Sequence, residues 1–294
     1  MTAFSSLASV SRIALRDNAT AAADAQYGYI PTESTGIFFL ALFGISTTLH
    51  ITQAAYYRTW WLLPTAALCG VGELLGWSGR LWSITSTIIA PTPLLAASFI
   101  IFSRMIQQLG QSYSLLTPRW YARLFLPCDL IALVVQGVGG GMASSADTLA
   151  GANVGAHVML GGICFQFVAI IVFSTLGCDY MRRYLRDRPL RPDSRARGVL
   201  TPRLKLMLAA LAFSTAVLIV RSVYRIVELV GGWEGSVIRT EVYFVVFDGG
   251  MVVLALFTLN FAHPGRLLRL APFETKHIAL ENMDDSHPLV TLVM

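Results

Sequence analysis

The chain has 294 residues, of which 55% are hydrophobic and only 13% are charged, and its net charge is +5. An average soluble domain is about 25% charged, so this composition excludes most soluble classes and indicates a membrane protein. The modest positive charge gives no reason to expect a nucleic-acid partner.

Apolar runs recur along the chain, and each is long enough to cross a bilayer, which takes roughly 20 residues of helix. They lie at about residues 34–56, 61–83, 89–109, 124–142, 154–178, 204–227 and 241–261. Because the runs are continuous rather than alternating, they predict helices and not barrel strands. We expect an all-α polytopic membrane protein, a seven-transmembrane-helix bundle. Its parts would be an N-terminal arm (1–33), a membrane domain (34–265) and a C-terminal tail (266–294).

Basic residues predict the orientation of this bundle. If the spans alternate in direction, sixteen of the 22 Lys and Arg residues fall on one side. The positive-inside rule places that side in the cytosol, so we expect the N-terminus outside and the C-terminus in the cytosol. A glycosylation sequon at Asn18 would then lie on the outer arm.

Four spans carry polar residues spaced seven apart, which is close to two helical turns and places both members of a pair on one face. The pairs are Glu73 with Arg80, Asp129 with Gln136, Arg221 with Glu228, and Glu241 with Asp248. Ionisable groups are costly in lipid and normally face a bundle interior or a cavity. We therefore expect these faces to point inward. Similar depth predicts that Arg221 meets Asp248.

Most of these polar residues, with His157 and Tyr224, fall in the predicted outer halves of their helices. Asp129 lies nearer the cytosolic end. The pattern favours a chamber that opens outward, in which carboxylates attract a cationic group, and Glu73 is our first choice because it lies deepest. Ion pairs that lock the bundle are the alternative, and the same residues can serve both purposes.

Catalytic patterns are lacking. The chain has no H-E-x-x-H, C-x-x-C or G-x-S-x-G motif, and its cysteines lack metal-ligand spacing. We expect no enzyme activity, no metal site and no cofactor. Haem held by His157 or His50 is an alternative.

Short motifs follow one another in a specific order over about residues 27 to 265. They include Tyr27-Gly-Tyr-Ile-Pro31, Glu73-Leu-Leu-Gly-Trp-Ser-Gly-Arg80, Asp129 with Gln136-Gly-Val-Gly-Gly-Gly141, Gln166, Arg221-Ser-Val-Tyr-Arg-Ile-Val-Glu228, and Glu241 with Phe247-Asp248. This order resembles the fungal RTA-like family, also called lipid-translocating exporters. Trp77 stands where the family often has Tyr.

The resemblance implies a seven-helix plasma-membrane protein related to exporters of sphingoid long-chain bases, which confer resistance to such lipids. We expect a lipid exporter whose partners are membrane lipids and an amphiphilic substrate, with a homodimer as a possibility. A lipid-sensing receptor and a haem or porphyrin transport protein are the alternatives. The candidate ligand-binding residues are Glu73, Arg80, Asp129, Gln136, His157, Gln166, Arg221, Tyr224, Arg225, Glu228, Glu241 and Asp248.

Overall fold

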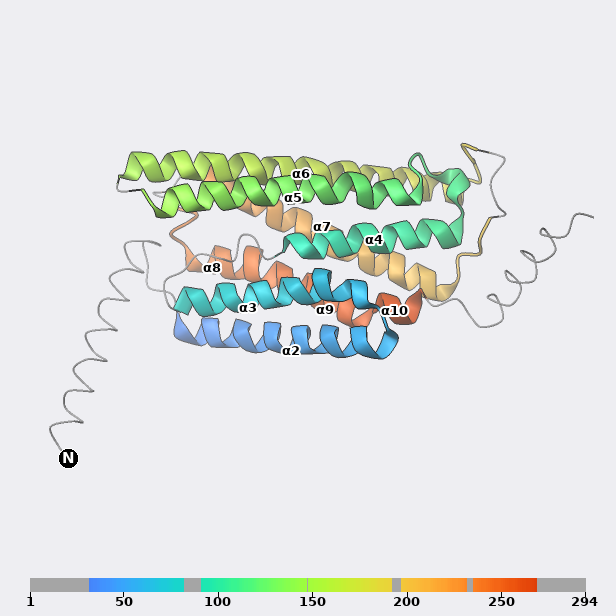
Figure 1. Ribbon diagram of the computed structural model, residues 1–294, viewed down its shortest axis with the longest axis horizontal. Helices are drawn as coiled ribbons and strands as arrows, with labels where there is room; N and C mark the ends of the chain where they lie inside the picture. The colour runs from blue at the N-terminus through green and yellow to red at the C-terminus, as the bar shows by residue number, and fades with distance from the viewer. Residues whose placement is uncertain (1–31, 82–90, 147, 192–196, 232–234, 269–294) are drawn as a thin grey trace, which may run out of the picture.

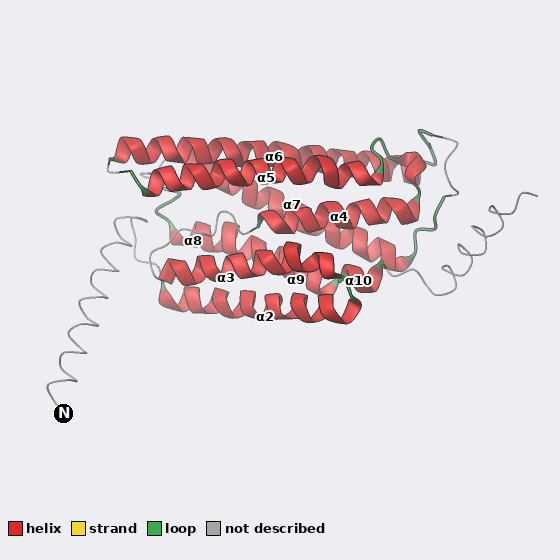
Figure 2. Ribbon diagram, in the orientation of Figure 1, coloured by secondary structure: helices red, strands yellow, loops and turns green. Residues whose placement is uncertain are grey.

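The computed structural model describes residues 32–81, 91–146, 148–191, 197–231 and 235–268. These residues form helices joined by short loops and contain no strand (Figure 2), which confirms the expected all-α fold. The sequon at Asn18 and nearly all of the predicted arm and tail lie outside the described residues.

Each predicted apolar run becomes helical. The long helices are α2 (Glu33–Tyr57), α3 (Leu68–Leu81), α4 (Thr92–Leu109), α5 (Pro118–Ser144), α6 (Leu149–Leu185) and α7 (Pro202–Val230). A 3₁₀ turn, η1 (Trp60–Leu62), and a π-helical turn, η2 (Leu63–Ala67), precede α3, and a 3₁₀ turn, η3 (Gln111–Tyr113), follows α4. The last run consists of α8 (Glu241–Phe244), the π-helical η4 (Val245–Gly250), α9 (Met251–Phe261) and α10 (Pro264–Leu267).

Within the described residues, five helical segments are long and apolar enough to cross a membrane. They are Glu33–Tyr57, Pro118–Ser144, Leu149–Leu185, Pro202–Val230 and Glu241–Leu267. The chain is thus a polytopic membrane protein. The other two expected spans are helical but do not reach this standard, and α4 begins part-way along the bundle (Figure 1). The count of seven spans and the orientation stay predictions.

The helices lie side by side along the long axis of the molecule (Figure 1). Helix α5 packs on α6, α4 packs on α5, α7 packs between α6 and α9, and α2 packs on α3. Large apolar side chains such as Phe38, Leu130 and Val168 stay more than half exposed. In lipid an exposed apolar surface carries no hydrophobic penalty, so these side chains fit a bundle that contacts acyl chains.

Glycines let α5 and α6 approach closely. A Cβ atom on Gly139 would lie 2.4 Å from the backbone nitrogen of Met159, and one on Gly155 would lie 2.4 Å from that of Ala143. Small residues at a helix crossing allow tight packing where lipid provides no hydrophobic force between helices. The α5–α6 contact thus fixes the two helices that carry Asp129, Gln136 and Gln166.

Helix starts follow ordinary capping rules. Thr201 precedes α7, and its hydroxyl accepts a hydrogen bond from the Leu204 backbone N–H at 3.3 Å. Pro202 occupies the first helical position, where its missing N–H costs little.

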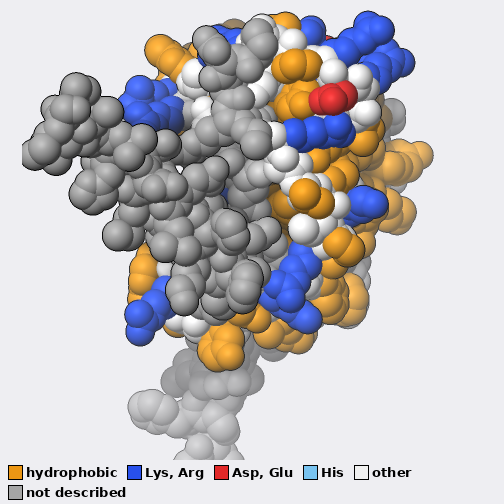
Figure 3. Space-filling view, turned by 90° about the vertical axis from the view of Figure 1, so that its right-hand side faces the viewer, with side chains coloured by type: hydrophobic (Ala, Val, Ile, Leu, Met, Phe, Trp, Pro, Cys, Tyr) orange, Lys and Arg blue, Asp and Glu red, His pale blue; other side chains and the backbone are white. Residues whose placement is uncertain are grey.

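Basic side chains gather at the end of the bundle that Figure 3 shows, which carries α10 and the start of α5. Arg58, Arg119, Arg123 and Arg266 belong to elements at this end, and acidic side chains are sparse in the view. The clustering supports the proposal that this end faces the cytosol.

Candidate functional site

A buried ion-pair cluster joins α7 to η4. The Arg225 guanidinium donates from Nε to Asp248 Oδ1 at 2.8 Å and from Nη2 to Oδ2 at 2.6 Å. Arg221 Nε lies 2.8 Å from the same Oδ1, as an ion pair without hydrogen-bond alignment. The predicted meeting of Arg221 with Asp248 is therefore confirmed, although Arg225 makes the stronger, two-pronged contact.

Helix α7 adds two more members to this cluster. Arg225 Nη1 donates to Glu228 Oε2 at 2.8 Å, and the Tyr224 hydroxyl donates to Glu228 Oε1 at 3.0 Å. Residues three or four apart on a helix are neighbours, so the sequence spacing itself positions these partners. The Arg225 guanidinium carbon also lies 5.2 Å from the centre of the Phe244 ring, which provides a cation–π contact.

Glu73 on α3 is a fully buried carboxyl beside this cluster. It lies within electrostatic reach of Asp248, Arg221 and Arg225. Neither of its carboxyl oxygens makes an aligned hydrogen bond to a described residue. The indole of Trp77, one turn along the helix, is a neighbouring hydrogen-bond donor to this carboxyl. Buried charges normally have partners, so Glu73 is the exception in this cluster.

The cluster is unbalanced in formal charge. Its described members include three carboxyls, Glu73, Glu228 and Asp248, but only two guanidiniums, Arg221 and Arg225. Arg80 lies seven residues after Glu73 on α3, and its side chain is outside the described part of the structure. A proton on Glu73 or a cationic ligand next to it would restore neutrality.

Asp129, Gln136 and Gln166 form a second buried network, between α5 and α6. Gln166 Nε2 donates to Asp129 Oδ1 at 2.6 Å and to Thr92 Oγ1 at 3.3 Å, and Gln136 Nε2 donates to Gln166 Oε1 at 3.0 Å. Gln166 thus links the Asp129 carboxylate to Thr92, the first residue of α4, where the positive end of that helix dipole lies. The expected shared face of Asp129 and Gln136 is therefore confirmed, since both side chains contact Gln166.

Two predicted site residues lie elsewhere. Glu241 accepts hydrogen bonds from the Thr32 backbone N–H at 3.0 Å and from its hydroxyl at 2.8 Å. Asp248 instead pairs with Arg221 and Arg225, and the π-helical η4, whose turns are wider than those of an α-helix, lies between it and Glu241. His157 is exposed on α6.

The histidine alternatives for haem differ in their surroundings. His50 is fully buried, and its Nε2 lies 3.2 Å from the Leu256 carbonyl oxygen. The described residues contain no group of three or more side chains arranged to hold a metal ion.

Sequence reasoning missed the residues that enclose the cluster. Phe39 stacks on Trp77 with ring centres 4.3 Å apart, and Trp77 lies 5.6 Å from Phe244. Gly249 makes this packing possible, since a Cβ there would lie 2.5 Å from the Trp77 ring. Aromatic residues are common in membrane spans, so only the glycine directly after Asp248 offered a signal.

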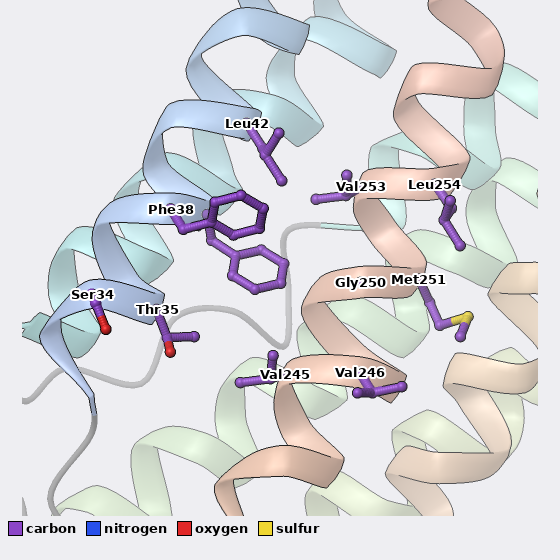
Figure 4. Close-up of a pocket in the computed structure, with 11 residues that line it drawn as sticks. Ser34, Thr35, Phe38, Leu42, Val245, Val246, Gly250, Met251, Val253 and Leu254 are labelled. Atoms are coloured by element: carbon purple, nitrogen blue, oxygen red, sulfur yellow. The ribbon is translucent and has the colours of Figure 1, made fainter.

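A groove lies on the other side of Phe39, between α2 and the η4–α9 segment (Figure 4). Its volume is about 620 Å³, within the range of about 300–1,000 Å³ typical of small-molecule sites. Ser34, Thr35, Phe38 and Leu42 line one wall. The opposite wall is formed by Val245, Val246, Gly250, Met251, Val253 and Leu254.

The fold and these contacts define a class: an all-α polytopic membrane protein with a buried ion-pair cluster and a mainly apolar groove between two of its helical segments. The chain belongs to the family described as RTA1 like protein, whose family model matches residues 66–271 and so covers the cluster from Glu73 to Asp248. The expected RTA-like membership is therefore confirmed.

Named relatives agree with this membership. The chain is 28% identical over 280 residues to the sphingoid long-chain base transporter RSB1 of Saccharomyces cerevisiae, covering 81% of this chain and 73% of the relative. It is 26% identical to the probable lipid transporter atnI of Emericella nidulans, covering 82% and 71%. It is 25% identical to the lipid-translocating exporter-like protein RTA1 of Leptosphaeria maculans, covering 81% and 51%. No solved structure matches the chain.

Proposed function

We propose that the protein is a plasma-membrane lipid transporter that exports single-chain cationic amphiphiles of the sphingoid long-chain base type. Membership of the RTA1-like family supports the class, and the relatives' names support lipid substrates. Those relatives are named as transporters or exporters, which supports a protein that moves its ligand without chemical change.

The observation that carries this proposal is the buried Glu73 carboxyl, whose oxygens receive no aligned hydrogen bond from the side chains that the structure describes. Asp248 and Glu228 already hold the Arg225 guanidinium at 2.6–2.8 Å, so these acids are occupied. Glu73 is buried, and no side chain in the described ranges gives it an aligned donor. A primary ammonium group is a compact cation with three donors, and it fits a site whose described side chains include three carboxyls but two guanidiniums.

Burial strengthens this attraction. The Coulomb energy between opposite charges rises as the effective dielectric constant falls from that of water to that of a protein interior. Glu73 has no exposed surface. The Trp77 ring lies one turn along α3, and it contacts the rings of Phe39 and Phe244. When no amine is bound, Glu73 is most simply neutral with a proton on its carboxyl, because burial of a carboxylate without a matching cation costs free energy. Exchange of the proton for the amine then gives a loading step.

The test is export of a labelled sphingoid base from cells that express Glu73→Gln, which keeps the shape of the side chain and removes its charge. We expect the variant to lose export and resistance to the base while it reaches the membrane in normal amounts. Asp179→Asn is the matched control, since Asp179 pairs with Arg183 on the surface of α6 at 2.7 Å. Normal export by a well-folded Glu73→Gln protein would exclude this role.

A further inference from the structure

The groove between α2 and η4–α9 combines an apolar length with a polar end. Phe38, Leu42, Val253 and Leu254 line its apolar length, and Ser34 and Thr35 provide hydroxyl groups at the start of α2. Residues 34 and 42 are eight positions apart, which corresponds to roughly 12 Å along a helix. The groove thus extends along about two turns of α2 and has hydroxyl groups at one end.

Glu241 lies outside the lining of the groove but close to its polar end, four residues before Val245 on one wall. Glu241, the first residue of α8, accepts two hydrogen bonds from Thr32, which immediately precedes α2. This contact joins the two walls of the groove next to Ser34 and Thr35. A carboxylate has about four acceptor sites, so Glu241 can receive a further donor while it holds Thr32.

The groove faces the bilayer and not the bundle interior. Both of its walls belong to segments able to cross a membrane, and Phe38, Val246 and Leu254 on its rim are 58%, 44% and 46% exposed. An acyl chain gains no hydrophobic energy by leaving lipid for an apolar groove. Selection of one lipid over another must therefore come from the shape of the groove and from its polar end, where hydroxyl groups and a carboxylate are available.

A thin aromatic wall separates the groove from Glu73. Phe39 contributes to the groove and stacks on Trp77, which lies one helical turn from Glu73. On the η4 side, Gly249 leaves room for both rings. Few side chains thus stand between a membrane-accessible surface and the buried acid.

We infer that this groove is a lateral docking site for the single apolar chain of a membrane amphiphile, with its amino and hydroxyl headgroup held at Glu241, Ser34 and Thr35. The inference rests on the proposed function and adds the place where the substrate leaves the bilayer. The occupant is one acyl chain with a cationic head. The acid at the polar end complements the amine, and the hydroxyl groups complement a polyol head.

The experiment uses the full chain in membranes and a sphingosine analogue that carries a photoactivatable diazirine in its chain and an alkyne for detection. Crosslinked peptides are mapped by mass spectrometry. We expect labels on Phe38, Leu42, Val253 or Leu254. Val246→Trp fills the groove and is expected to remove these labels and reduce export. Val168→Trp places the same side chain on the exposed face of α6, at a position 58% exposed in the native protein, and is expected to change neither.

Each contrary outcome has a distinct meaning. Labels spread over α6, or unchanged in Val246→Trp, would overturn the groove as a docking site, and so would normal export by a Val246→Trp protein that has lost its labels. Conversion of a dimer to a monomer by Val246→Trp, without loss of lipid labels, would make the groove an interface between copies. Absence of base export by the wild-type protein would instead contradict the proposed function. Comparable melting temperatures for the two Trp variants exclude misfolding as the cause.

Discussion

Arg225 and Asp248 form a two-pronged ion pair across the α7–η4 contact, with donor–acceptor distances of 2.8 and 2.6 Å in a fully buried setting. Such parallel contacts match the planar fork of a guanidinium to both oxygens of a carboxylate. Arg221 approaches the same carboxylate, so Asp248 is the centre of the cluster.

Removal of either partner is expected to destabilise the bundle strongly. Arg225→Ala leaves Asp248 and Glu228 buried without their main partner, at a cost of about 3–5 kcal/mol. Arg225→Lys should restore only part of this, because an ammonium lacks the planar fork. Unfolding of purified protein in detergent measures the loss. The surface variant Arg183→Ala is expected to cost below about 1 kcal/mol, and equal effects at the two sites would contradict the structural role.

The close α5–α6 contact leads us to predict that alanine substitution has different effects on stability at two nearby glycines. Gly139→Ala should destabilise the protein because the added Cβ would lie 2.4 Å from the Met159 backbone. Gly141→Ala should be neutral or stabilising, by up to about 1 kcal/mol, since nothing lies within 4 Å of its Cβ position. Melting temperatures of the two variants provide the comparison. Equal tolerance at both positions would show that the helices do not pack as closely as described.

The Asp129–Gln166 hydrogen bond predicts a dependence between two substitutions. Gln166→Leu leaves the Asp129 carboxyl without its 2.6 Å donor, which should cost about 1–3 kcal/mol. Replacing both partners removes the unsatisfied group, so adding Asp129→Leu should recover part of the loss. A double-mutant cycle on unfolding free energies measures the coupling. Simple additivity would argue against a direct interaction.

The proposed orientation predicts that the tail beyond residue 268 is cytosolic. The basic end of the bundle supports it. A glycosylation acceptor placed in the tail should stay unmodified, and the native sequon at Asn18 should be modified. An epitope at the C-terminus that antibody reaches on intact cells would reverse the assignment.

We predict that the protein does not bind one haem per chain through a histidine ligand. His157 is exposed on α6, and His50 lies against the Leu256 carbonyl. Absorption spectra of purified protein with added haem, compared with His50→Ala and His157→Ala, provide the measurement. A Soret band at one haem per chain that either substitution abolishes would restore the haem alternative.

The sequence by itself determined the class and much of the α7 stripe. Continuous apolar runs require helices because lipid offers the backbone no hydrogen bonds. The spacing of Tyr224, Arg225 and Glu228 then sets their local contacts, because residues three and four apart lie side by side on a helix. Equal depth also predicted the Arg221–Asp248 meeting correctly, since both residues lie a similar number of turns from the same end of the bundle.

Only the tertiary structure decided which face met which partner. A stripe specifies a face of a helix but not its neighbour, so Gln136 joined Asp129 through Gln166 rather than the outer cluster. The π-helical η4 changed the rotation between Glu241 and Asp248 and placed them in different contacts. The groove lies between α2 and the η4–α9 segment, and the aromatic packing around Trp77 joins rings from three segments. Such features depend on residues far apart in the chain, and local periodicity does not encode them.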